Sequence, residues 1–180
     1  MRKKMNNIFK IILGLVFIFC SISSSAKELR QIGDYLQIAI PAYAIGRAYG
    51  LDDQEGLRQM GTGLIVNLAA TQAIKKSTLQ MRPDGSNRLS FPSGHTSAAF
   101  QGAAFIHKRY GWDKAWPHYI AAGMVGYSRI ESNRHYWRDV IAGAALGIGV
   151  SWYLTTPRQE SGLIIFHDRN STNLLYVASF

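Results

Sequence analysis

Cysteine is almost missing from the sequence, and the single residue of this type, Cys20, lies near the N-terminus. A disulfide needs two cysteines, so the rest of the chain holds neither a disulfide nor a cysteine ligand for a metal ion. We therefore expect the folded part of the chain to be stabilised by packing alone.

Long hydrophobic runs are also lacking. No stretch reaches the roughly 20 apolar residues that mark a membrane-spanning helix, and the mean hydropathy of −0.04 is low for a polytopic membrane protein. The range Val140–Leu154 comes nearest; it is apolar all round, which predicts burial in protein or in lipid. Gly143 and Gly147 would allow another helix to pack closely against it. We expect a membrane-associated bundle and do not predict that it spans.

The N-terminal 26 residues contain no acidic residue and begin with a basic cluster. An apolar run, Ile11–Cys20, and the small residues Ser21–Ala26 follow. This order predicts that residues 1–26 are a secretory signal peptide, cut before Lys27, or an uncleaved N-terminal anchor. In both cases the rest of the chain is exported to the bacterial cell envelope.

A dense basic stripe is the third absence. The formal net charge is +9, and four of the basic residues lie in the first 26 positions, so the remainder carries 16 basic and 11 acidic side chains. This excess is spread along the chain. It suits an anionic substrate or a membrane surface, and it argues against a nucleic-acid partner.

Residues 27–157 are predicted to form one all-α domain, a bundle of about five core helices, because strict strand-like alternation is rare there. The apolar-rich stretches are Tyr35–Arg47, Leu57–Leu79, Thr96–Arg109, Ala115–Tyr127 and Val140–Leu154. The tail, residues 158–180, differs. Its β-prone runs Leu163–Phe166 and Leu174–Phe180 predict a short hairpin.

The first of three polar motifs is Lys75 followed, seven positions on, by Arg82 and then Pro83. Lys75 falls near the end of a predicted helix, and Pro83 restricts Arg82 to an extended backbone. A planar guanidinium and a compact ammonium can converge on one phosphate group. Taken alone, the pair also fits two solvated cations at a helix end.

The second motif is Pro92-Ser93-Gly94-His95, followed by an apolar run. It predicts a loop that enters a helix with Ser93 as the N-cap. Free N–H groups at a helix start bind anions, and Gly94 lets an anion come close. His95 would lie at the mouth of such a site. An ordinary N-cap with a surface histidine explains this motif equally well.

The third motif is Ser128-Arg129, then His135 and Asp139. Residues four apart lie on one face of a helical turn, so we expect Asp139 to accept a proton from one imidazole nitrogen of His135. The other nitrogen is then free to attack a substrate. A surface ion pair is the alternative. Against it, Asp139 directly precedes the most apolar helix, where an unpaired charge is costly.

Together the three motifs resemble the complete signature of the type 2 phosphatidic acid phosphatase superfamily, in order and in spacing. That group includes lipid phosphatases, bacterial class A acid phosphatases and vanadium haloperoxidases. The resemblance covers roughly Leu57 to Tyr153. It implies a helical bundle and a reaction that needs no metal or other cofactor. Paired carboxylates and His/Glu clusters at metal-ligand spacing are indeed missing from the sequence near the motifs.

The resemblance also implies a role for each signature residue. His135 is expected to be the nucleophile that forms a phosphohistidine, and Asp139 to orient it. His95 is expected to protonate the leaving oxygen and later to activate water. The expected phosphate cradle consists of Lys75, Arg82, Ser93, the Gly94 amide and Arg129.

Three functions stay open from the sequence. The favoured one is a phosphatase that acts on a lipid phosphate or diphosphate, in the inner membrane with its active site in the periplasm. The second is a soluble periplasmic acid phosphatase of broad specificity, which the low hydropathy favours. The third is a non-catalytic envelope component that uses the hairpin for assembly, and the intact set of signature residues argues against it. The chain is short for a haloperoxidase, and its oligomeric state is not predicted.

Overall fold

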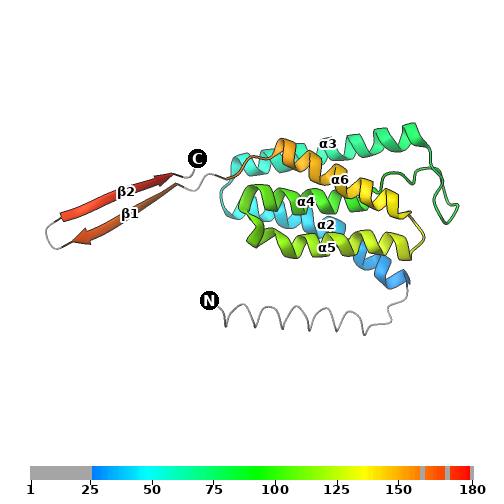
Figure 1. The fold of residues 1–180 in the computed structure, drawn as a ribbon, viewed down its shortest axis with the longest axis horizontal. Helices are drawn as coiled ribbons and strands as arrows, with labels where there is room; N and C mark the ends of the chain where they lie inside the picture. The colour runs from blue at the N-terminus through cyan, green and yellow to red at the C-terminus, as the bar shows by residue number, and fades with distance from the viewer. Residues whose placement is uncertain (1–25, 159–160, 169–170, 179–180) are drawn as a thin grey trace.

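The computed structural model describes residues 26–158, 161–168 and 171–178. These form five helices and one two-stranded sheet (Figure 1): α2 (Ala26–Gly50), α3 (Gln54–Thr78), α4 (Gly94–Tyr110), α5 (Trp112–Glu131), α6 (Trp137–Leu154), β1 (Ser161–Asp168) and β2 (Ser171–Ala178). The predicted all-α bundle of about five helices is confirmed. The predicted signal peptide or anchor lies, apart from Ala26, outside the described residues.

Helix α2 begins at Ala26, well before the predicted start near Tyr35. The prediction followed apolar content, whereas the first turns of α2 are built from residues that favour helix without being apolar, such as Glu28 and Arg30. The other four helices extend the predicted stretches by a few residues at one or both ends, except that α3 stops at Thr78 and Leu79 is its left-handed C-cap, with φ of 46°.

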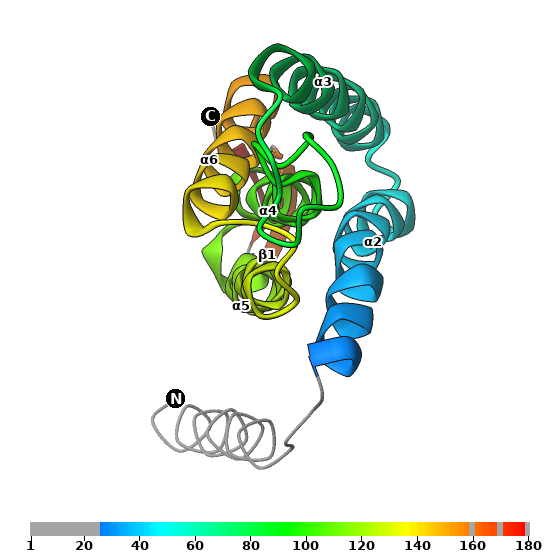
Figure 2. The ribbon, with the colours of Figure 1, turned by 90° about the vertical axis from the view of Figure 1, so that its right-hand side faces the viewer.

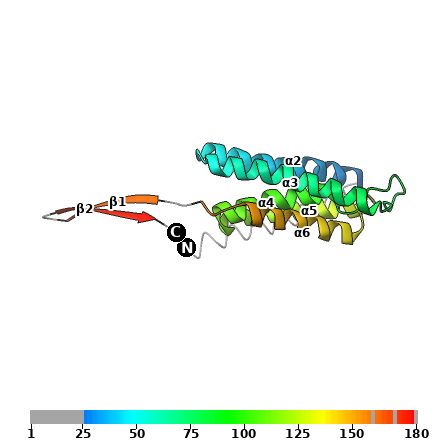
Figure 3. The same cartoon turned by 90° about the horizontal axis from the view of Figure 1, so that it is seen from above.

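The central helix of the bundle is α4, which packs against α2, α3, α5 and α6. Figure 2 shows α4 end-on with the others around it, and Figure 3 shows α2 and α3 in one layer and α4, α5 and α6 in the other. Small residues let α4 occupy this place: Ala99 and Ala103 pack with Val125 in one core cluster. Phe105 packs with Met60 in a second cluster nearer the other end of α4.

The closest helix contact joins α4 and α6. A Cβ atom added to Gly143 would overlap the carbonyl oxygen of Ser93, and one added to Gly147 would overlap that of Ser97. The predicted close helix contact at these two glycines is therefore confirmed. It fixes the start of α4 against the start of α6.

The face of α6 opposite these glycines is exposed; the sequence predicted burial of this helix in protein or in lipid. Ile141 is 64% exposed and Tyr153 is 89% exposed, so burial within the protein accounts for one face of the helix only. Within residues 26–158, no helix combines the length and the apolar character that crossing a membrane requires.

The two strands pair antiparallel, with Ser161 opposite Ala178 and Asp168 opposite Ser171. This is the predicted hairpin, with slightly different limits. In the described part of the chain the two strands contact each other and none of the helices, and Figure 1 shows them projecting from one end of the bundle.

We predict that Gly147→Ala lowers the free energy of unfolding by about 1–3 kcal/mol, because the added methyl group forces α6 away from α4. Gly149→Ala is the matched control, since nothing lies within 4 Å of a Cβ atom at that position. Alanine favours a helix over glycine by about 1 kcal/mol, so the control should be as stable as the wild type or more so. Denaturant titration measures both, and equal stability of the two variants would contradict the close contact.

Candidate active site

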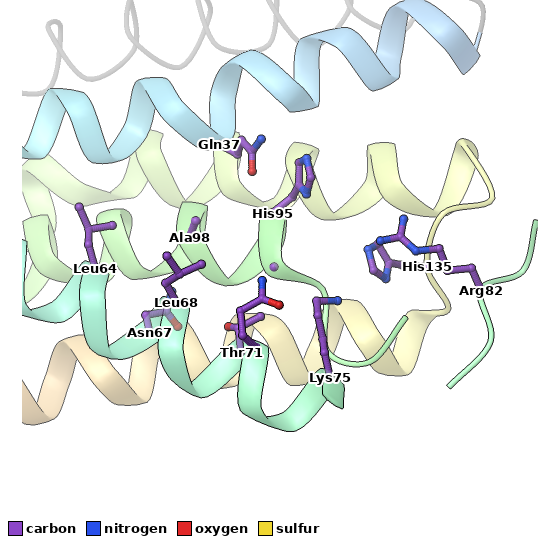
Figure 4. Close-up of a pocket in the computed structure, with 12 residues that line it drawn as sticks. Gln37, Leu64, Asn67, Leu68, Thr71, Lys75, Arg82, His95, Ala98 and His135 are labelled. Atoms are coloured by element: carbon purple, nitrogen blue, oxygen red, sulfur yellow. The ribbon is translucent and has the colours of Figure 1, made fainter. Parts of the chain in front are cut away.

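The three signature motifs meet at one end of the bundle. The last turns of α3 and α5 and the first turns of α4 and α6 all lie at this end, because successive helices alternate in direction (Figure 1). A cavity of about 460 Å³ opens there between α2, α3 and α4 (Figure 4). Of the predicted site residues, those that line it are Lys75, Arg82, Gly94, His95 and His135.

His135 and Asp139 form the predicted pair, but not on one helical turn. His135 lies in the connection before α6, and Asp139 is the third residue of that helix. The Asp139 carboxylate closes the helix start by accepting the backbone N–H of Tyr136 at 3.0 Å, and the same oxygen lies 3.4 Å from His135 Nδ1. The Ser90 hydroxyl donates to it as well, at 2.5 Å. The carboxylate thus holds the imidazole by its Nδ1 side.

The surroundings of His135 favour its neutral form. The residue is 2% exposed, and burial lowers the pKa of its imidazole from 6.5 to about 4, helped by the charges of Lys75 and Arg82 and opposed by Asp139. A neutral imidazole with Nδ1 facing a carboxylate keeps its proton on Nδ1. Nε2 then carries the lone pair, as a nucleophile requires.

The predicted N-cap of α4 is confirmed at Ser93. Its hydroxyl lies 2.9 Å from the Thr96 hydroxyl, and its backbone N–H donates to the carbonyl oxygen of Asp139 at 2.9 Å. Ser93 is completely buried, so it supports the start of the helix from behind the cavity. Gly94 does line the cavity, and its missing side chain leaves room there for an anion near the helix start.

Lys75 and Arg82 bring two cations to the cavity. The Lys75 ammonium donates to the carbonyl oxygens of Leu89 at 2.7 Å and Ser90 at 3.1 Å; it has three donors, so a third can serve an anion. Burial and then the charge of Arg82 lower the Lys75 pKa to about 8. Burial likewise lowers the pKa of Arg82, whose Nε donates to Asn87 Oδ1 at 3.0 Å.

Arg129 lies behind the cavity wall and faces α2. Its Nη1 donates to the carboxylate of Asp34 at 2.7 Å, and its Nη2 donates to the carbonyl oxygen of Arg30 at 2.7 Å. His95 Nε2 lies 3.1 Å from the same oxygen of Asp34. The pKa of His95 is lowered to about 4 by burial and then by Arg129, while Asp34 acts in the opposite direction.

Sequence reasoning missed Asp34 and Ser90. Ser90 lies two positions before Pro92, and no pattern in the sequence distinguishes it from an ordinary loop serine. Asp34 directly precedes the apolar stretch that begins at Tyr35, in a segment that was not expected to be helical. A lone acid at the edge of an apolar helical stretch is a weak signal, and only the packing of α2 against α5 gives it meaning.

We predict that acid destabilises the fold through the two site histidines. The pKa of each is about 4 in the folded protein against 6.5 ordinarily, so between these values the unfolded chain binds protons that the folded chain does not, and stability falls as the pH is lowered. For the buried His135 alone the loss between pH 7.5 and 4.5 is about 2 kcal/mol. His135→Asn keeps a donor for Asp139 and does not titrate.

Thermal unfolding of both proteins between pH 7.5 and 4.5 measures this dependence. The variant should lose less stability on acidification than the wild type. Identical pH dependence in the two proteins would show that His135 titrates alike in the folded and unfolded states.

The chain is similar in sequence to two lipid phosphatases. The lipid A 1-phosphatase of Porphyromonas gingivalis is 41% identical over 101 residues, 54% of this chain and 21% of that protein. Lipid phosphate phosphatase 1 of Arabidopsis thaliana is 39% identical over 72 residues, 32% of this chain and 22% of that protein. The chain thus spans about a fifth of the length of these relatives.

The crystal structure of LpxE from Aquifex aeolicus shares the fold. It matches with a TM-score of 0.53 at 20% identity, over 69% of this chain and 90% of that chain. The family model of the PAP2 superfamily matches residues 56–162, a range that holds all three motifs and more than half of the chain. The match agrees with the family expected from the motifs: the chain belongs to the PAP2 superfamily.

Proposed function

We propose that the protein is a phosphatase that hydrolyses phosphate monoesters or diphosphates of lipids through a phosphohistidine at His135. The observation that carries this proposal is a single cavity with two unlike ends (Figure 4). Its cationic end holds Lys75, Arg82, His95 and His135, and its other, more apolar end holds Leu64, Leu68 and Ala98 together with the polar Asn67. The first suits a phosphate group, and the second suits a hydrocarbon chain attached to it.

In the first step of the proposed reaction, Nε2 of His135 attacks phosphorus and the bond from phosphorus to the ester oxygen breaks. His95 transfers a proton to the departing oxygen, so the lipid alcohol leaves neutral. Asp139 keeps the proton of His135 on Nδ1 and balances the charge that the ring acquires. Lys75 and Arg82 stabilise the charge on the phosphoryl oxygens.

In the second step, His95 is neutral and takes a proton from water. The water oxygen attacks phosphorus, the phosphorus–nitrogen bond breaks, and its electron pair returns to Nε2 of His135. Inorganic phosphate leaves, and both histidines regain their starting protonation states. These side chains supply the nucleophile, the acid and base, and the stabilising charges.

A lipid substrate has two further supports. The names of the two relatives, lipid A 1-phosphatase and lipid phosphate phosphatase 1, both refer to lipid phosphates. Helices α2 and α3, which both contribute to the cavity lining, also expose large apolar side chains: Tyr35, Ile38, Tyr49, Ile65 and Leu68. We therefore propose that the protein works at a membrane surface on the extracytoplasmic side of the cell envelope. The soluble broad-specificity acid phosphatase is the second candidate, and the non-catalytic envelope component is the third.

His135→Asn is expected to lower kcat/KM by at least about a thousandfold, because the nucleophile is lost while the contact with Asp139 is kept. Rapid acid-free quenching after mixing with ³²P-labelled substrate should label the wild-type protein and leave the variant unlabelled. His118→Asn, which lies outside the cavity lining, is the control and should react like the wild type. Full activity in His135→Asn would remove the central assignment.

Binding of a lipid chain at the more apolar end of the cavity can be tested with Leu68→Ser. We expect kcat/KM for a long-chain lipid phosphate in detergent micelles to fall by about tenfold, because apolar contact with the chain is lost. The value for p-nitrophenyl phosphate should hardly change. Ile141→Ser on α6 is the control, since Ile141 is 64% exposed and does not line the cavity. Equal losses on both substrates would contradict binding of the lipid chain at this end of the cavity.

A further inference from the structure

The Asp34 carboxylate contacts two signature residues, His95 and Arg129, although Asp34 belongs to none of the three motifs. Its Oδ1 lies 3.1 Å from Nε2 of His95 and 2.7 Å from Nη1 of Arg129. It stands on α2, before the range 56–162 that the family model matches. A carboxylate placed between the expected general acid and a buried arginine is a second pairing of Asp with His, beside that of Asp139 with His135.

Packing holds Asp34 at this place. Arg129 is 2% exposed, and it fixes α2 through the Arg30 carbonyl as well as through Asp34. One residue before Asp34, a Cβ atom on Gly33 would overlap the Ser128 hydroxyl. The backbone of α2 therefore lies directly on α5 here, which places the Asp34 carboxylate, 41% exposed, within reach of both His95 and Arg129.

We propose that Asp34 is a positioning residue that binds the Nε2–H of His95, so that Nδ1 of His95 exchanges the proton with the leaving oxygen and with water. This inference rests on the proposed function, because it assigns a task to the acid of that reaction. It follows from chemistry: an imidazole whose Nε2–H faces a carboxylate offers only Nδ1 to a substrate, and its protonated form is stabilised.

The positive charges around His95 disfavour its protonated form, and an anionic partner opposes this effect. Arg129 from α5 and Arg82 from the loop after α3 both face it and, together with burial, hold its pKa near 4. Lys75 and His135 line the same cavity. Among the groups that act on the pKa of His95, Asp34 is the one that raises it. A general acid needs its proton before the leaving group departs, so the negative charge of Asp34 favours the step.

Asp34→Asn tests the proposal, since asparagine can keep a hydrogen bond to His95 but not the charge. We expect kcat/KM for hexyl phosphate, whose alkoxide needs a proton, to fall by about tenfold or more. For p-nitrophenyl phosphate, whose leaving group needs little protonation, the fall should be under about threefold. The pKa of His95 falls in the variant, so the alkaline limb of kcat/KM against pH should move to lower pH by about one unit.

Two comparisons exclude a merely structural effect. Asp52→Asn removes the same charge in the turn that follows α2, where Asp52 accepts a hydrogen bond from Gln54, and it should leave both rates and the pH profile unchanged. Asp34→Glu keeps the negative charge, so its rate on hexyl phosphate should fall less than that of Asp34→Asn. A structural role would reduce both substrates alike and would not move the alkaline limb.

The outcomes separate this inference from the function on which it rests. An active wild-type protein whose Asp34→Asn variant loses both substrates equally, or keeps its pH profile, would overturn the role of Asp34 alone. So would a rise in kcat/KM, because Asp34 would then compete with phosphate for Arg129. A wild-type protein that hydrolyses no phosphate ester would overturn the proposed function first.

Discussion

A backbone hydrogen bond joins the starts of α4 and α6 in the candidate site. The N–H of Ser93 donates to the carbonyl oxygen of Asp139 at 2.9 Å, so the start of α4 touches the start of α6. This contact is possible because Gly143 and Gly147 let the backbones approach, and a side chain at either position would overlap α4. His95 and His135, one on each side of the bond, are brought to one cavity by this close packing.

Electrostatic balance is the second constraint on the site. Lys75, Arg82 and Arg129 are cations that are wholly or partly withdrawn from water, and burial lowers the pKa of each. Such burial is costly unless the charge is paired or bound. Asp34 and Asp139 each neutralise part of this charge, and a phosphate group in the cavity would offset more of it. The site is thus arranged for an anion in its charge as well as in its shape.

The two carboxylates bind their histidines through different nitrogens. Asp139 faces Nδ1 of His135, and Asp34 faces Nε2 of His95. In the proposed mechanism each contact leaves the other ring nitrogen for the substrate, so that His135 would attack with a lone pair and His95 would deliver a proton. Asp139 is itself fixed by the start of α6, while Asp34 depends on the packing of α2 on α5. The second pair is therefore the more sensitive to how α2 sits.

The sequence by itself determined the helical class, the N-cap at Ser93, the close contact at Gly143 and Gly147, and the family, because these follow from periodicity, local backbone preference and motif spacing. It also indicated that the signature residues would share one site. Only the tertiary structure decided that His135 precedes its helix, that Arg129 faces α2, and that Leu64 and Leu68 line the cavity beyond its cationic end. The physical reason is that these features depend on contacts between residues far apart in the chain. Asp34 and Arg129 are 95 positions apart, and no local pattern can report which partner a buried charge will find.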